Sequence, residues 1–115
     1  MKTYFETIHK TEIDGFQVIA SVAPETDFSP EDLFDDSIDD IDEIHRKINN
    51  GIYQWFFIRV QVMKSGKELG CSSIGGLLYE DPMEVMTDGI YADCLDEAMR
   101  EAVKFVKIIK EEITI

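Results

Sequence analysis

The side chains that most often carry chemistry in small proteins are few in this chain and stand far apart. The two cysteines are Cys71 and Cys94, and the two histidines are His9 and His45. Zinc needs four converging ligands, which usually show as Cys or His pairs at short spacing. A catalytic Cys or Ser needs a base within hydrogen-bond reach, oriented by a third group. Because neither pattern is present, we expect no catalytic residue, no metal and no other cofactor.

Carboxylates are abundant, and their spacing points to a function. Residues 35–40 lack both the alternating oxygen ligands and the glycine of a calcium loop. If residues 31–48 form a single helix, six acids recur at helical spacing and share one face. Four like-charged i, i+4 pairs on that face would cost on the order of 1–2 kcal/mol at low salt, which suggests a partner that offsets this cost. We call these six residues the acidic stripe: Asp32, Asp35, Asp36, Asp39, Asp40 and Glu43.

The acidic stripe has dimensions that a nucleic-acid strand also has. From Asp32 to Glu43 it would span roughly 16 Å, and its carboxylates recur about every 5.4 Å, which is comparable to phosphate spacing. We therefore predict that the stripe replaces phosphates and binds a protein with a basic nucleic-acid-binding surface. Electrostatic steering would make that association fast and salt-sensitive. The plainer interpretation is a solvated helix face.

The elements that would position these residues begin with a hairpin over residues 3–22. Its turn is Asp14-Gly15, because both central residues of a type I′ turn need a positive φ. With this turn, Ile13 lies opposite Phe16. The side chains predicted to share their face of the hairpin are Phe5, Thr7, His9, Thr11 and Val18.

A second hairpin is predicted over residues 52–79, with its turn at 64–67. The glycine pair at 75–76 indicates a bulge or bend in the return strand. Cys71 alternates with Leu69 on that strand and is expected to be a core residue. The predicted buried face of the first strand consists of Phe56, Ile58, Val60 and Val62.

A helical segment follows each hairpin. Residues 30–50 begin after an N-cap Ser29 and can be read as one helix or as two. The apolar spacing of residues 92–112 predicts a long helix. The order β-β-α-β-β-α predicts a single α+β domain over residues 1–115, a four-stranded antiparallel sheet with both helices packed on one face.

Three aromatic residues fall on the other face of the predicted sheet: Tyr53, Trp55 and Phe57. Either that face is also covered, or these residues form an exposed patch that anchors a protein interface. In the second case the chain would be a sheet-mediated interaction module without an inhibitory role, and a homodimer is one form that such a module takes.

The overall composition excludes several classes of protein. The chain has 115 residues, with 24 Asp and Glu against 11 Lys and Arg, a net charge of −13. Direct nucleic-acid binding and docking on anionic membranes both require a basic surface. No apolar run is long enough to span a bilayer, and residues 1–6 lack the apolar core of a signal peptide. With only two cysteines, a cytoplasmic location is expected.

In size, acidity and lack of catalytic motifs the chain resembles two groups of small proteins. One comprises phage anti-defence proteins that mimic nucleic acids, including anti-CRISPR and anti-restriction proteins; the other comprises immunity proteins that neutralise nuclease toxins. The resemblance lies in the acids of residues 25–43 and 80–101, and it assigns no individual residue a role. It implies a non-enzymatic inhibitor of a nucleic-acid-processing enzyme or defence complex, in the host cytoplasm if phage-encoded. A nuclease-toxin immunity protein is the alternative.

Overall fold

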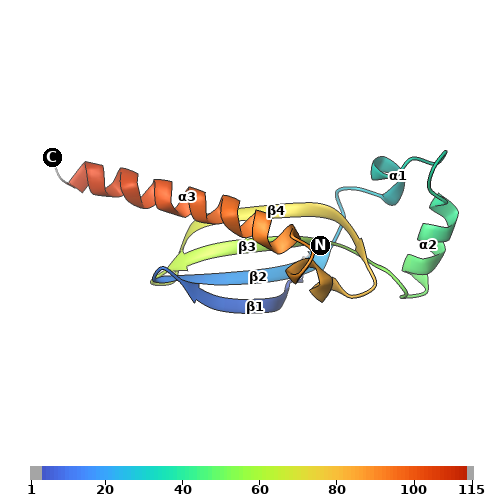
Figure 1. Ribbon diagram of the computed structural model, residues 1–115, viewed down its shortest axis with the longest axis horizontal. Coiled ribbons are helices and arrows are strands. Elements are labelled where there is room, and N and C mark those ends of the chain that lie inside the picture. The colour runs from blue at the N-terminus through green and yellow to red at the C-terminus, as the bar shows by residue number, and fades with distance from the viewer. Residues whose placement is uncertain (1–3, 114–115) are drawn as a thin grey trace.

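The chain forms an antiparallel sheet of four strands in the order β1-β2-β3-β4 (Figure 1). The structure is a computed structural model that describes residues 4–113. The strands are β1 (Glu6–Ile13), β2 (Phe16–Pro24), β3 (Gln54–Lys64) and β4 (Lys67–Tyr79). The predicted α+β class and the four-stranded antiparallel sheet are confirmed.

Both hairpin turns lie where the sequence predicts them. Asp14 and Gly15 have φ values of 52° and 83°, and Ser65 and Gly66 have 52° and 78°. Positive φ at both central residues matches the right-handed twist of the flanking strands. The turns therefore set the register at the hairpin ends, with Ile13 opposite Phe16 and Lys64 opposite Lys67.

Helix α3 (Ile90–Ile113) covers one face of the sheet, over β3 and β4 (Figure 1). Its contact residues are small: Cys94, Ala98 and Ala102 are fully buried. The backbone of β4 approaches it closely, since a Cβ atom on Gly70 would lie 2.1 Å from the carbonyl oxygen of Ala98. The predicted buried face of β3 packs in this core, as the low exposure of its four residues confirms: Phe56, Ile58, Val60 and Val62.

A bulge in β1 overturns the predicted facing of its first residues. Thr7 pairs with Ser21, but His9 pairs with Ala20, so one extra residue stands between them. Because side chains alternate along a strand, that residue moves Phe5 and Thr7 to the face opposite α3, which we call the outer face. His9 stays on the α3 face, where its ring lies 5.6 Å from that of Tyr91.

Two irregularities in the pairing of β3 with β4 also affect facing. One lies at the glycine pair 75–76, where a bulge was predicted. The other lies between Val62 and Met63, beside Leu69. It places Cys71 opposite Gln61 on the outer face, so the prediction of Cys71 as a core residue is wrong: an irregularity in the ladder breaks simple alternation.

Two short helices, α1 (Pro30–Leu33) and α2 (Ile41–Asn49), replace the single helix that the acidic stripe presumes. α2 lies beyond the end of the sheet and packs against α1, so the prediction that it shares a face with α3 is wrong (Figure 1). Its link to α1 contains four aspartates at residues 35–40, and burying them under a sheet would cost their hydration. A 3₁₀ turn, η1 (Pro82–Met86), connects β4 to α3.

The molecule is elongated, with extents of 60 × 30 × 25 Å. Its radius of gyration is 17.1 Å, against about 13 Å for a compact domain of this length. α1 and α2 extend it at one end and the last turns of α3 at the other (Figure 1). Among residues 4–113, no helix is both long enough and apolar enough to span a membrane.

Candidate functional site

The sheet topology brings two acidic segments to one end of the molecule. Pro24 at the end of β2 pairs with Phe56, and Tyr79 at the end of β4 pairs with Gln54 at the start of β3. The chain therefore leaves the same end of the sheet into residues 25–53 and again into residues 80–89. We define the acidic end as residues 25–43 and 80–88, which hold ten and four carboxylates.

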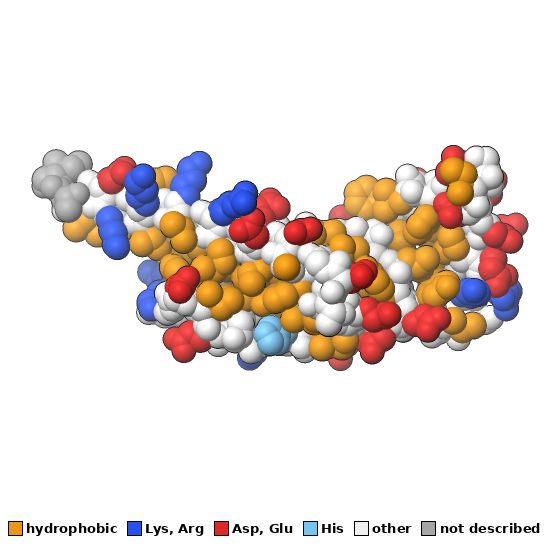
Figure 2. Space-filling view, viewed as in Figure 1, with side chains coloured by type: hydrophobic (Ala, Val, Ile, Leu, Met, Phe, Trp, Pro, Cys, Tyr) orange, Lys and Arg blue, Asp and Glu red, His pale blue; other side chains and the backbone are white. Residues whose placement is uncertain are grey.

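Charge is segregated along the long axis of the molecule. Acidic side chains surround α1, α2 and η1 and also follow the N-terminal half of α3, whereas most lysines lie at the hairpin turns and the C-terminal half of α3 (Figure 2). Lys64 and Lys67 flank one turn, and the helix carries Lys104, Lys107 and Lys110. The acidic end therefore faces solvent largely without cations from the rest of the protein.

Within the acidic end, Asp32 and Asp35 hold the local backbone. Asp32 Oδ2 accepts hydrogen bonds from Ser29 N at 2.9 Å and Ser29 Oγ at 3.0 Å, which caps α1. Asp35 Oδ1 accepts from Ser37 N at 2.9 Å and Ser37 Oγ at 2.7 Å. These bonds lower the pKa of both aspartates, since they favour the charged form.

Two further residues of the stripe serve α2. Asp40 is its N-cap, and Oδ1 accepts a hydrogen bond from Glu43 N at 3.1 Å. Glu43 forms an ion pair with Arg46 and lies 3.9 Å from Lys47, and the hydrogen bond from Arg46 lowers its pKa. Arg46 and Lys47, which belong to α2 as Glu43 does, therefore partly neutralise this carboxylate.

Three of the four aspartates in residues 36–42 hold no other part of the structure in place. Among residues 4–113, the side chains of Asp36, Asp39 and Asp42 make no recorded hydrogen bond or ion pair, and those of Asp36 and Asp42 are exposed. Asp36 and Asp39 belong to the predicted stripe. Asp42 was missed because it falls off the face of the presumed helix, although the count of acids in residues 25–43 includes it.

The outer face of the sheet holds the acidic end in position. Glu25 Oε2 accepts a hydrogen bond from Gly76 N at 2.8 Å, and Trp55 Nε1 donates to the carbonyl oxygen of Phe28 at 2.9 Å. A Cβ atom on Gly76 would lie 2.1 Å from Leu33 Cδ1. Helix α1 therefore packs against the glycine bulge of β4.

The three aromatic residues proposed as an interface are half-buried against their own chain. The ring of Trp55 lies 6.1 Å from that of Phe34, and the ring of Phe57 lies 5.6 Å from that of Phe5. Lys47 Nζ lies 5.1 Å from the ring centre of Tyr53. These contacts within the chain leave all three side chains partly exposed, so an aromatic interface at this face stays a prediction.

The Cys71 thiol and the Tyr79 hydroxyl both have raised pKa values and stay protonated at neutral pH. Burial raises the pKa of Cys71, with a further contribution from Glu68, so the thiol keeps its proton at neutral pH. Tyr79 donates a hydrogen bond to Asp88 Oδ2 at 2.5 Å, which raises the pKa of Tyr79 to about 12 and ties the η1 segment to the sheet. Within residues 4–113, no three His, Cys, Asp or Glu side chains converge as metal ligands.

Comparisons with known protein families, curated proteins and solved structures gave no match for this chain.

Proposed function

We propose that this protein is a non-enzymatic inhibitor that uses its acidic end to occupy the basic nucleic-acid-binding surface of another protein. The observation that carries the proposal is the convergence of two acidic segments, distant in sequence, at one end of the sheet. In residues 25–53 and 80–89, which leave this end of the sheet, the lysine and arginine residues are Lys47 and Arg46, and both lie near Glu43. The partner's cations would replace the counterions of this end.

The unpaired aspartates favour binding without internal rearrangement. Asp36, Asp39 and Asp42 break no contact of their own when they meet a cation, whereas Asp32, Asp35 and Asp40 would have to give up capping bonds or share them. We therefore assign the strongest contacts to the unpaired set. The capping aspartates add to the negative potential and hold the backbone on which that set is displayed.

Competition with nucleic acid tests the proposal. The probe is a panel of nucleases, restriction complexes and CRISPR effectors, each bound to a fluorescent duplex. We expect the protein to displace the duplex from at least one of them, with weaker displacement at higher salt. The triple variant Asp36→Lys, Asp39→Lys and Asp42→Lys should lose displacement by at least about tenfold, since each reversal opposes the same basic surface.

A matched control separates local from net charge. The variant Glu12→Lys, Glu97→Lys and Glu101→Lys makes the same charge change at exposed positions outside the acidic end, and it should displace the duplex as the wild type does. Equal losses in both variants, or a target that binds the protein and its duplex simultaneously, would contradict the proposal. A nuclease toxin in the panel tests the immunity-protein alternative with the same variants.

A further inference from the structure

The outer face of the sheet carries a pocket of about 270 Å³ beside the glycine bulge of β4. The space exists because Gly75 has no side chain: a Cβ atom there would lie 2.6 Å from Glu25 Oε2 and 3.7 Å from Phe28 Cε2. The lining combines two aromatic rings, two carboxylates and a hydroxyl over a bare stretch of backbone. It comes from the segment between β2 and α1 and from strands β3 and β4: Glu25, Asp27, Phe28, Phe57, Ser73 and Gly75.

Both carboxylates of the pocket can accept further hydrogen bonds. Within residues 4–113, the exposed Asp27 side chain makes no hydrogen bond or ion pair. Glu25 accepts one amide hydrogen on each oxygen, from Asp27 at 3.1 Å and from Gly76 at 2.8 Å, which fixes its position and leaves lone pairs free. Since none of the described residues that line the pocket is a lysine or arginine, its negative charge is not balanced by its own lining.

The aromatic rings of the pocket are also open to a ligand. Phe28 is 48 % exposed. Arg59 lies on the same face, opposite Ser73, but its guanidinium carbon lies 3.6 Å from the centre of the Phe5 ring, which in turn contacts Phe57. Cations are attracted to the faces of aromatic rings, and this part of the sheet already holds one in that way. The pocket offers the same kind of surface to a second cation.

We propose that this pocket binds the side chain of a lysine from a protein partner. The ammonium group would donate hydrogen bonds to Asp27, Glu25 and Ser73, and the aliphatic chain would lie against the rings of Phe28 and Phe57. A guanidinium fits less well, because it favours two free oxygens of one carboxylate and both oxygens of Glu25 already accept amide hydrogens. The inference deepens the proposed function and rests on it for the source of the lysine, since part of the lining belongs to the acidic end.

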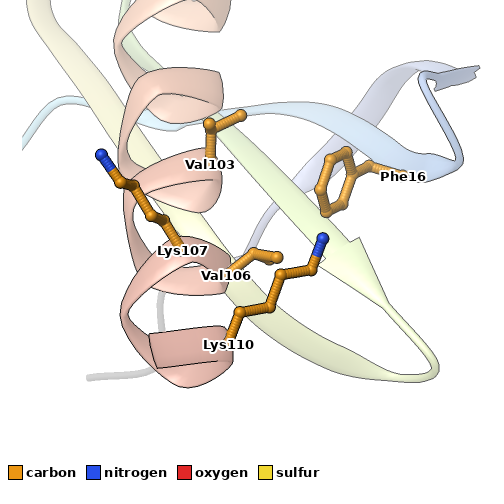
Figure 3. A pocket seen from close by; sticks show the side chains of 5 residues that line it. All are labelled: Phe16, Val103, Val106, Lys107 and Lys110. Atoms are coloured by element: carbon orange, nitrogen blue, oxygen red, sulfur yellow. The ribbon is translucent and has the colours of Figure 1, made fainter. Parts of the chain in front are cut away.

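A groove at the other end of the molecule has the opposite charge and serves as an internal control. Figure 3 shows it beside the last turns of α3, where Phe16 lies across from Val103 and Val106 and the Lys110 side chain extends towards Phe16. Its volume is about 320 Å³, and the described residues that line it include no carboxylate. Apolar surface and size are therefore similar in the two places, but only the first suits an ammonium group.

Titration with a blocked lysine, N-acetyl-lysine methylamide, tests the site without any partner protein. In about 0.15 M sodium chloride, we expect saturable changes in the amide NMR signals of Ser73 and Gly75, with a dissociation constant of about 1–10 mM. The signal of Val106 in the lysine-bearing groove should not move. The norleucine analogue, which lacks only the ammonium group, should not bind, and the arginine analogue should bind at least about threefold more weakly.

Variants of the lining should weaken binding of the blocked lysine, and matched variants elsewhere should not. Asp27→Asn should weaken it by about tenfold, because a charge-assisted hydrogen bond is lost, and Phe28→Leu by about fivefold, because a ring face is lost. Asp36→Asn removes the same charge from the acidic end outside the pocket. Phe105→Leu changes a phenylalanine that is 44 % exposed on α3. Both controls should bind as the wild type does.

Three results would overturn the lysine site: equal shifts with the norleucine analogue, equal weakening by Asp36→Asn, or no saturation below about 50 mM. Tighter binding of free lysine than of the blocked compound would overturn the assignment to a protein side chain. A protein that binds the blocked lysine but displaces no duplex would keep the site and lose the proposed function. One that displaces a duplex but does not bind the blocked lysine would lose the site alone.

Discussion

Gly76 determines how α1 packs on β4, because this position requires both a positive φ and space for a neighbouring side chain. Its φ is +67°, a conformation that L side chains rarely adopt, and α1 packs against the place where its Cβ would be. Its amide hydrogen also holds Glu25. The absence of a side chain at Gly76 thus lets α1 pack against the end of the sheet, and the rest of residues 25–43 extends from there.

Replacing Gly76 should loosen α1 while the sheet stays folded. Gly76→Ala introduces left-handed strain of about 1–2 kcal/mol and also pushes Leu33 away from the β4 bulge. Gly66→Ala is the matched control, since Gly66 has φ +78° but no neighbour within 4 Å. Fluorescence of Trp55, which is the single tryptophan, should change in the first variant and stay as in the wild type in the second. Identical spectra and denaturation midpoints for the two variants would argue against this docking.

Helix α1 depends on hydrogen bonds to charged carboxylates more than on burial. It has four residues, of which Pro30 is buried, and α1 is too short to be stable alone. Asp32 accepts a hydrogen bond from the amide of the N-cap Ser29, and Asp35 accepts one from the amide of Ser37 in the turn that follows the helix. The position of the acidic end is therefore coupled to the ionisation of its own residues.

Acidification should release α1 before the sheet unfolds. The pKa values of Asp32 and Asp35 lie below their ordinary value of 3.8 in the folded protein. Their stabilisation is therefore complete above about pH 4 and is lost as the pH falls through the lowered values. Trp55 fluorescence should change in this range while the circular dichroism of the sheet persists. The variant Ser29→Ala and Ser37→Ala should shift the change to higher pH, whereas fluorescence that stays constant down to about pH 2 would refute the coupling.

The elongated shape and the segregated charge are properties that no single element has. The sheet and α3 form the core, the acidic end extends at one extremity, and the last turns of α3 extend at the other (Figure 1). Carboxylates held at one end repel one another more than they would in an expanded chain. The folded state therefore carries an electrostatic cost that depends on ionic strength.

Added sodium chloride should stabilise the protein. Because the Debye length shortens from about 30 Å at 0.01 M to about 8 Å at 0.15 M, salt screens the repulsion within the acidic end. Each kcal/mol of repulsion that is relieved should raise the thermal midpoint by about 4 °C. The triple variant Asp36→Lys, Asp39→Lys and Asp42→Lys should show a smaller rise. A midpoint that falls with salt would mean that attractive ion pairs dominate the folded state.

Sequence alone determined the features that depend on neighbouring residues. The Asp-Gly and Ser-Gly turns, the alternation of buried residues in β3, and the apolar period of α3 each follow from local geometry, and the α+β class follows from their order. Asp36, Asp39 and Asp42 lie in residues 25–43, which composition identifies as acidic, but the single helix expected to carry Asp36 and Asp39 on one face does not form. The hydrogen bonds from Ser37 to Asp35 and the N-cap at Asp40 compete with a continuous helix across residues 34–40, and periodicity does not weigh such competition.

Tertiary structure alone decided where these elements stand and what covers them. The bulge in β1 places Phe5 on the outer face, where its ring contacts Phe57. The glycine bulge in β4 leaves space for Leu33 of α1 next to Trp55. The meeting of residues 25–43 with residues 80–88 depends on which strands end at the same end of the sheet. The exposure of the apolar residues in the last turns of α3 depends on where the sheet stops beneath the helix. These features come from contacts between residues distant in the chain, which local spacing does not encode.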